Sequence, residues 1–95
     1  MFVVFLRFSQ QKDRVGEFMD GHRAWLSQGF DDGVFLVAGM LEQGQGGAII
    51  AHGESREALE ARVEDDPFVQ GQVVAPEILE IDPARADERL QFLLE

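Results

Sequence analysis

Residues 2–8, FVVFLRF, define the first element of the fold and give it two apolar faces. Val and Phe favour a β-strand, and the side chains of a strand point alternately to opposite sides of the sheet. The two sets are Phe2, Val4, Leu6 and Phe8, and Val3, Phe5 and Arg7. Because both sets are largely apolar, the sequence predicts that both faces of the sheet are covered.

The next apolar residues recur with the period of a helix. They fall at offsets of 0, 3, 4, 7, 10 and 11 residues from Val15, which places them on one helical face. The members of this stripe are Val15, Phe18, Met19, His22, Trp25 and Leu26. The polar residues before the stripe can start the helix, and Gly29 is typical of a helix end.

The remainder of the chain predicts three strands and two shorter helices. The strands cover Val34–Ala38, Ala48–Ala51 and Gln72–Ile81, and the helices cover Arg56–Glu64 and a segment that begins at Asp82-Pro83. Ser55 is a good N-cap for the first of these helices, and Pro67 stops it. Pro76 lies inside the last strand, which favours an edge position or a bulge.

The order β-α-β-β-α-β, with a further helix after it, predicts a ferredoxin-like α+β sandwich. In this arrangement two helices cover one face of a four-stranded antiparallel sheet. The other face has no covering layer within the chain. We therefore expect a second subunit to cover it, in an isologous homodimer packed sheet to sheet.

A chain of 95 residues has the size of one domain. We assign residues 1–95 to a single domain, with residues 82–95 as a C-terminal helical extension. There are no cysteines, so neither a disulfide nor a thiolate metal site is expected. The net charge of −10 repels phosphate, which makes nucleic acid and anionic membranes poor partners. No apolar run is long enough to span a membrane, and we expect a cytoplasmic protein.

His22 stands within the apolar stripe of the first predicted helix. Histidine changes its charge near neutral pH, so a partly buried histidine beside a cleft can act as a general acid or base. The alternative is a core histidine whose two ring nitrogens are satisfied by backbone groups.

Asp66 precedes Pro67, which biases its backbone toward extended geometry. Because both helices lie on the same sheet face in the predicted fold, Asp66 could approach His22 and accept a hydrogen bond from its ring. A carboxylate in that place fixes the tautomer of the ring and supports the imidazolium. The alternative is a simple turn, in which Asp66 caps backbone amides and Phe68 anchors the loop.

Three other features carry weaker chemical signals. Arg7 could bind a substrate carboxylate in a two-pronged contact, or it could pair with one of the many acidic residues. His52 is expected to be a solvated loop residue, and two histidines without cysteine give no recognised metal spacing. The glycine-rich stretch 43–47 lacks the Lys-Ser/Thr and the following helix of a phosphate-binding loop. We expect a small-molecule ligand, no metal and no cofactor.

The chain resembles the YCII-related (YciI-like) domain family in four segments. These segments are FVVFLRF at 2–8, GHRAWL at 21–26, VAGML at 37–41 and HGESREALEARVEDDPFVQGQV at 52–73. The last is the most specific, since it combines a Ser-capped short helix, Asp-Pro-Phe and Gly71 in this order. The resemblance covers residues 1–81, and the C-terminal extension lies outside it.

The resemblance implies a dimeric ferredoxin-like fold, the dimeric α+β barrel, with a His–Asp active site in a cleft. The histidine of the family falls on His22, and its aspartate before Pro-Phe falls on Asp66. Some relatives act on small cyclic molecules, and their reactions include removal of chloride from lactone intermediates of aromatic degradation. Many relatives carry Gly-Pro where this chain has Gly39-Met40.

Three functions remain as hypotheses. The first is a lyase- or isomerase-like enzyme, in which His22 and Asp66 transfer protons in the elimination, isomerisation or hydrolysis of a small cyclic metabolite. The second is a binding module that holds such a metabolite without turning it over. The third is a structural dimer in which His22 is merely packed. An open cleft beside His22 favours the first two, and a sealed histidine favours the third.

Overall fold

The computed structural model describes residues 1–95 and contains the strands and helices in the predicted order. The strands are β1 (Phe2–Phe8), β2 (Phe35–Met40), β3 (Gly46–Ala51) and β4 (Val74–Glu80). The α-helices are α1 (Val15–Asp31), α2 (Arg56–Glu64) and α3 (Pro67–Gln70). Three short 3₁₀ helices complete the chain: η1 (Lys12–Arg14), η2 (Glu42–Gly44) and η3 (Glu88–Leu94).

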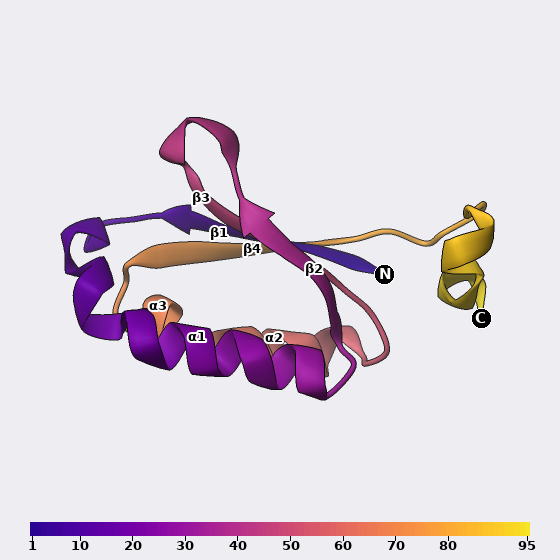
Figure 1. Cartoon of the computed structure of the whole chain (residues 1–95), viewed down its shortest axis with the longest axis horizontal. Helices are drawn as coiled ribbons and strands as arrows, with labels where there is room; N and C mark the ends of the chain where they lie inside the picture. Colours follow the sequence, from indigo (N-terminus) through magenta and orange to yellow (C-terminus); the bar gives the residue numbers. More distant parts are fainter.

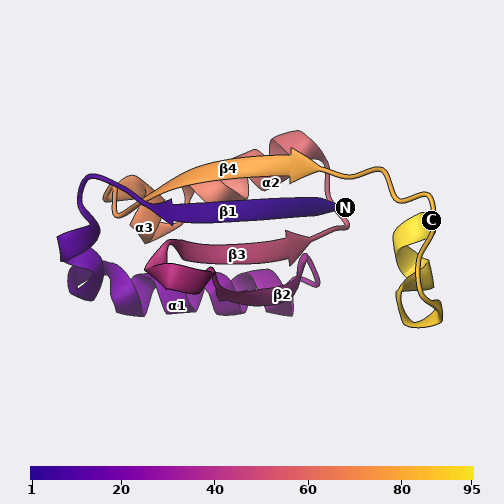
Figure 2. The ribbon, with the colours of Figure 1, turned by 90° about the horizontal axis from the view of Figure 1, so that it is seen from above.

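The four strands form one antiparallel sheet in the order β2-β3-β1-β4. Figure 1 shows the three α-helices together beneath the sheet, and Figure 2 shows the strands side by side with the helices behind them. The predicted ferredoxin-like α+β fold is confirmed. β4 is an edge strand, in agreement with the prediction from Pro76, because proline cannot donate a hydrogen bond to a second neighbour.

Burial along β1 follows the alternation predicted from its sequence. The side chains of Phe2, Val4 and Leu6 are buried, whereas Arg7 is exposed. The core below them continues through apolar residues of all the other strands and of the helical layer, including Phe35, Ile49, Leu59, Val63, Phe68 and Val74. One face of the sheet therefore carries the core, and the functional groups of the helical layer are held against it.

The predicted end of the first helix is wrong, because α1 continues past Gly29 to Asp31. Gly29 is buried against β2, and a Cβ atom at this position would lie 2.1 Å from the ring of Phe35. Glycine is thus required by the close approach of helix and strand, not by a cap. The residue that leaves the helix in a left-handed conformation is Gly33, with φ of 75°.

The chain after α2 also differs from the prediction. Pro67 follows the end of α2 as expected, but it also begins the one-turn helix α3. Near the C-terminus, residues 82–87 are not helical, and the side chain of Asp87, not Asp82, caps the final helix by accepting from Arg89 N–H at 2.9 Å. Residues 83–89 contain no large apolar side chain, so no contact holds an earlier helical turn in place.

The second face of the sheet carries apolar side chains that the chain itself does not cover. Cross-strand pairing places Val3 beside Ile50 of β3 and Leu79 of β4, and Ile50 beside Val37 of β2. Val37 and Leu79 are 60% and 46% exposed. The C-terminal segment does not lie over this face but stands beyond the end of the sheet (Figure 1). None of the helices has the length and apolar character needed to cross a membrane.

Candidate functional site

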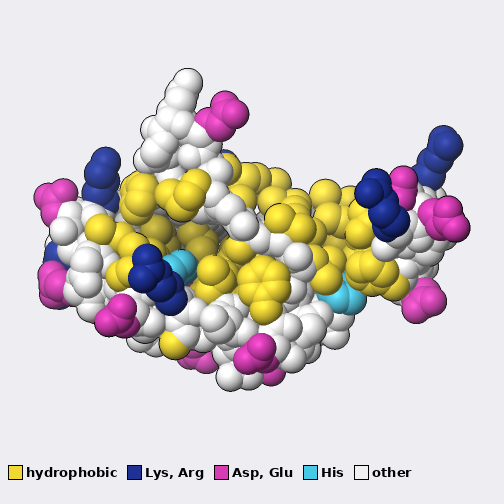
Figure 3. Space-filling view, in the orientation of Figure 1, with side chains coloured by type: hydrophobic (Ala, Val, Ile, Leu, Met, Phe, Trp, Pro, Cys, Tyr) yellow, Lys and Arg dark blue, Asp and Glu magenta, His cyan; other side chains and the backbone are white.

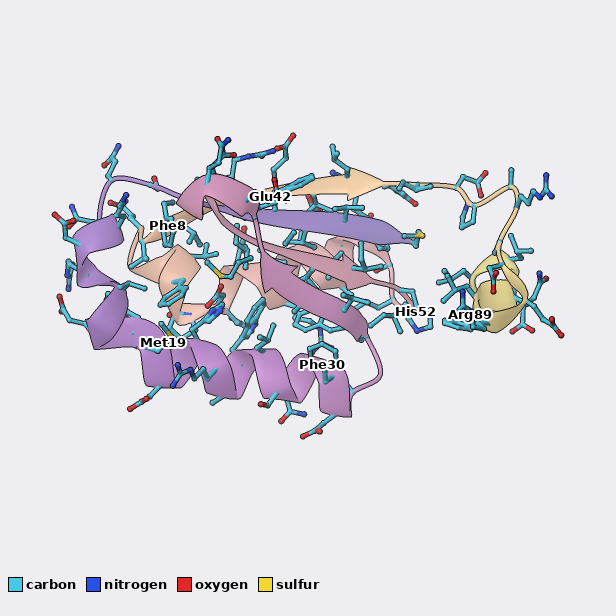
Figure 4. All side chains as sticks on the ribbon, turned by 45° about the horizontal axis from the view of Figure 1, so that its top comes forward. Phe8, Met19, Phe30, Glu42, His52 and Arg89 are labelled. Carbon is cyan, nitrogen blue, oxygen red and sulfur yellow. The ribbon has the colours of Figure 1, made fainter.

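A cavity of about 250 Å³ lies between α1 and the sheet, at the end where β1 finishes and β3 begins. Its walls are mainly apolar and include Leu6, Phe8, Met19, Leu26, Ile49 and Val74. Figure 4 shows Phe8 and Met19 at this end of the molecule, on the strand and the helix that enclose the space. No Asp, Glu, Lys or Arg lines the cavity, and His22 is its one ionisable side chain.

His22 reaches the cavity from the middle of α1, and its side chain is 16% exposed. In Figure 3 a histidine is visible in a hollow surrounded by hydrophobic side chains, between α1 and the β2–β3 connection. The ring stacks on Phe68 with a centroid distance of 4.0 Å and an angle of 8° between the planes. Packing therefore fixes the plane of the imidazole, while one edge of it remains open to small molecules.

Asp66 contacts the same imidazole from the helical layer. Its Oδ1 lies 2.8 Å from His22 Nδ1 and also accepts a hydrogen bond from Phe68 N–H at 3.0 Å. The residue has φ of −63° and ψ of 121°, the extended geometry expected before proline, and it caps α3. The two readings of Asp66 from the sequence are thus compatible, since one oxygen both caps backbone and contacts the histidine.

Each member of the pair has one polar atom without a hydrogen-bond partner in the protein. Asp66 is completely buried, yet its Oδ2 has no partner within the protein. His22 Nε2 likewise makes no hydrogen bond to the protein, because Nδ1 forms the only one found for this ring. If Nδ1 carries the proton that Asp66 accepts, Nε2 presents a free lone pair, which is the arrangement of a general base.

A close approach between α1 and α3 brings the two residues together. Gly21 precedes His22 and Pro67 follows Asp66, and a Cβ atom at Gly21 would lie 3.0 Å from Pro67 Cγ. The absence of a side chain at Gly21 lets the proline ring pack directly on the helix. This role of Gly21 was not predicted, although a glycine inside a strongly periodic helix is the signal that points to such a contact.

The other two candidate residues lie away from the cavity. Arg7 is on the opposite face of the sheet, where it pairs with Glu77 and lies over the ring of Phe5, 4.4 Å from its centroid. Of its two predicted roles, the structure shows the ion pair. His52 follows β3 at the far end of the sheet and contacts Phe92 at a ring distance of 5.2 Å, next to the C-terminal segment in Figure 4. No cluster of three or more His, Asp or Glu residues suitable for a metal ion is present.

A second polar cluster joins α1 to α2 on the other side of Trp25. Arg62 donates to Glu54 at 2.9 and 3.2 Å and to Asp32 at 2.8 Å. The hydrogen bonds to Glu54 and then to Asp32 raise the pKa of Arg62, and the hydrogen bond from Arg62 lowers the pKa of Asp32. Trp25 Nε1 donates to the backbone carbonyl of Arg62 at 2.8 Å, and its ring lies 5.7 Å from that of His22. This cluster was not predicted from the sequence.

Comparison with known proteins adds three findings. The profile of the YCII-related domain matches residues 1–82. A similar solved structure is 5-chloro-2-hydroxyhydroquinone dehydrochlorinase (TftG) from Burkholderia phenoliruptrix AC1100, in complex with 2,5-dihydroxybenzoquinone. It superposes with a TM-score of 0.68 at 18% sequence identity, over 85% of this chain and 93% of the other. Comparison with curated protein sequences finds no match.

Proposed function

Since the chain belongs to the YCII-related domain family, we propose that it is a small-molecule enzyme in which His22 transfers protons and Asp66 orients it. The observation that carries this proposal is the 2.8 Å contact between His22 Nδ1 and Asp66 at the wall of an apolar cavity. The family resemblance pointed to the same two residues independently of their distance in the structure.

The chemistry follows from the two ring nitrogens. Nδ1–H donates to the Asp66 carboxylate, so Nε2 is free to remove a proton from a substrate in the cavity. The resulting imidazolium carries a proton on both nitrogens and is stabilised by the buried carboxylate beside it. The apolar walls lower the local dielectric constant, which strengthens this electrostatic effect. No cofactor is needed for such a step.

The reaction class we favour is an elimination or isomerisation on a small cyclic metabolite. In an elimination, Nε2 takes a proton from carbon, the C–H electron pair forms a double bond, and the leaving group departs with its own electron pair. The similar solved enzyme is named as a dehydrochlorinase, which is a reaction of this kind. A hydrolysis, in which His22 activates water, uses the same two residues.

A homodimer is part of the proposal, with residues 1–95 as one domain and residues 82–95 as its extension. The support is the uncovered apolar face of the sheet, which includes Val3, Val37, Ile50 and Leu79. Burying such a face is the simplest way for a small domain to gain apolar area. Sedimentation should give a dimer at micromolar concentration, and Val37→Asp should shift it toward monomer. A monomeric wild type would contradict this part.

The activity is tested by incubating the protein in D₂O with a panel of small cyclic ketones, lactones and chlorinated hydroquinones. NMR would report exchange of carbon-bound hydrogen, and ion chromatography would report released chloride. We expect exchange or elimination for part of the panel, lost in His22→Gln and retained in His52→Gln. The second variant is the matched control, because His52 is the other histidine and lies at the far end of the sheet.

A binding module is the second candidate, favoured by the same apolar cavity with its one polar side chain. It predicts saturable binding of a panel compound that is recovered unchanged after long incubation, with similar affinity in wild type and His22→Gln. Turnover that survives in a folded His22→Gln variant would instead rule out the proposed proton transfer.

A further inference from the structure

Basic side chains are scarce in this chain, and most of them are used in ion pairs. There are 8 Lys and Arg residues against 18 Asp and Glu residues. Five of the eight have a carboxylate within 4.0 Å, namely Arg7, Arg14, Arg56, Arg62 and Arg89. The other three, Lys12, Arg23 and Arg85, form no such pair. In so acidic a chain, a cation without an acidic partner is a candidate for binding an anion. Two of the three lie beside the cavity.

Arg23 lies on α1 between residues that line the cavity. It directly follows His22, and it stands between Met19 and Leu26, both of which are cavity walls. Figure 3 shows a basic side chain over α1 at the rim of the hollow, next to the histidine. Arg23 is the only Lys or Arg within α1. Because Arg23 lies about one turn from both of these wall residues on the same helix, it borders the open side of the cavity, its mouth, although it is not part of the apolar lining.

A carboxylate is available to Arg23 but is not used. Asp20 lies three residues earlier on the same helix, at a spacing that permits an ion pair, yet no pair forms between them. Lys12 is the second free cation at this end, where its Nζ lies 5.6 Å from the centroid of Phe8, a cavity wall. Two of the three unpaired cations of this acidic chain thus lie at the cavity end of the molecule.

We propose that Arg23 binds an anionic oxygen group of the substrate at the mouth, while an uncharged, compact ring or chain occupies the cavity beside His22. This inference deepens the proposed function and rests on it. The cavity has room for about eight water molecules at ~30 Å³ each, which is the size of one small ring. Its lining holds no charged residue, so an anionic group would be stable at the rim and not inside.

The guanidinium suits this role because its fork of N–H donors matches the two oxygens of a carboxylate. Binding the anion at the rim would also fix the orientation of the ring, so that one carbon faces His22 Nε2. Arg23 is accordingly a positioning and specificity residue, and His22 remains the group that moves the proton. The substrate class is a small monoanion with an apolar body.

The test uses benzoate and its neutral analogue benzamide as probes. Binding is followed by the fluorescence of Trp25, which is the only tryptophan and has its ring 5.7 Å from His22. We expect wild type to bind benzoate about 5-fold to 10-fold more tightly than benzamide, as one charge-assisted contact in partly exposed surroundings allows. The preference should shrink at high salt.

Two variants distinguish a direct contact of Arg23 with the anion from a general effect of net charge. Arg23→Gln should abolish the preference for benzoate while leaving the affinity for benzamide within about 2-fold. Arg85→Gln removes the same charge from the C-terminal segment, outside the cavity walls, and should leave the preference unchanged. If both variants lost the preference for benzoate equally, the preference would be a long-range effect of charge only, and the inference would be overturned.

The inference is also overturned if wild type prefers benzamide, or if neither probe binds at about 10 mM, a concentration at which a fragment-sized ligand should be detected. These results differ from a failure of the proposed function. A benzoate preference that depends on Arg23, together with unchanged turnover in His22→Gln, would leave the anion site intact and remove the proton-transfer role.

Discussion

Two polar clusters connect α1 to the chain segment 54–66, and they differ in how completely their hydrogen bonds are satisfied. At one, Arg62 is partly buried and is paired with both Glu54 and Asp32. At the other, His22 and Asp66 share a single contact, and Nε2 and Oδ2 remain without protein partners. The first cluster is satisfied within the protein, whereas under the proposed function the second leaves two polar atoms for a ligand.

The contrast indicates which part of this small domain should be tested for function. A buried carboxylate oxygen without a partner costs stability, so it persists only where something else offsets it. Trp25 stands between the clusters and links them, since its indole donates to the Arg62 carbonyl while its ring lies near His22. The contrast predicts that substitutions in the two clusters separate activity from stability.

The largest effect is expected for Asp66→Asn. Asparagine caps a helix about as well as aspartate, so α3 and its hydrogen bond to Phe68 N–H should survive. The variant removes the charge that supports the imidazolium, and kcat should fall by about 100-fold or more, whereas KM changes little. Steady-state kinetics on a substrate identified from the panel, with circular dichroism as the check on folding, measures this. An unchanged kcat would leave Asp66 with a capping role alone.

The next largest effect is expected for Arg62→Met, and it is on stability instead of activity. The variant leaves Glu54 and Asp32 without their cation and should lower the free energy of unfolding by about 1–2 kcal/mol, with activity nearly retained. Arg56→Met is the matched control, because it loses two exposed ion pairs 3.8 Å long and one exposed hydrogen bond to the Ile78 carbonyl, so less than about 1 kcal/mol is expected. Urea denaturation measures the free energy of unfolding of both variants. Equal decreases would show that the Arg62 cluster stabilises the fold no more than the contacts of Arg56 do.

A smaller effect should appear in acid. The hydrogen bonds from Arg62 and Gln28 lower the pKa of Asp32 in the folded protein from its ordinary value of 3.8. A lowered pKa contributes stability above that ordinary value, and the contribution disappears as the pH falls through the folded value. Asp32→Asn should therefore be less stable than wild type near neutral pH, with the gap closing below pH 3.8. A gap that stays constant across this range would refute the linkage.

Much of this arrangement was accessible from the sequence, and the reasons for the failures are physical. The period-2 pattern of residues 2–8 predicted the strand. The helical stripe from Val15 predicted the helix and the inward position of His22. The Asp-Pro dipeptide indicated the extended backbone that aims Asp66. The end of α1 at Asp31 was not predicted, because it depends on the packing of Gly29 against Phe35. The one-turn helix α3 was also missed, although its signal is local, since Pro67 was interpreted only as the stop of α2 and not as the first residue of a helix capped by Asp66.

The partners of Arg62 and the absence of a partner at Arg23 could not be predicted from the sequence. An acidic chain offers each arginine many possible partners, and only the tertiary structure decides which of them lie within reach. The dimer interface is of this kind too, since an apolar strand face predicts that something covers it but does not name the partner.

The smallest effect is expected for Gly21→Ala, and it tests the close packing that unites His22 with Asp66. Alanine favours a helix over glycine by about 1 kcal/mol, but its Cβ would lie 3.0 Å from Pro67 Cγ, so α3 must move by a few tenths of an ångström. These effects oppose each other, and the free energy of unfolding should change by less than about 1 kcal/mol. The His22–Asp66 contact should lengthen, with a fall in kcat of about 3-fold to 10-fold.

Gly16→Ala is the control, since a Cβ atom there meets nothing within 4 Å and only the helical preference changes. A Gly21→Ala variant as active as Gly16→Ala would show that the site tolerates this displacement, and that the orientation of the imidazole depends on the stack with Phe68 instead.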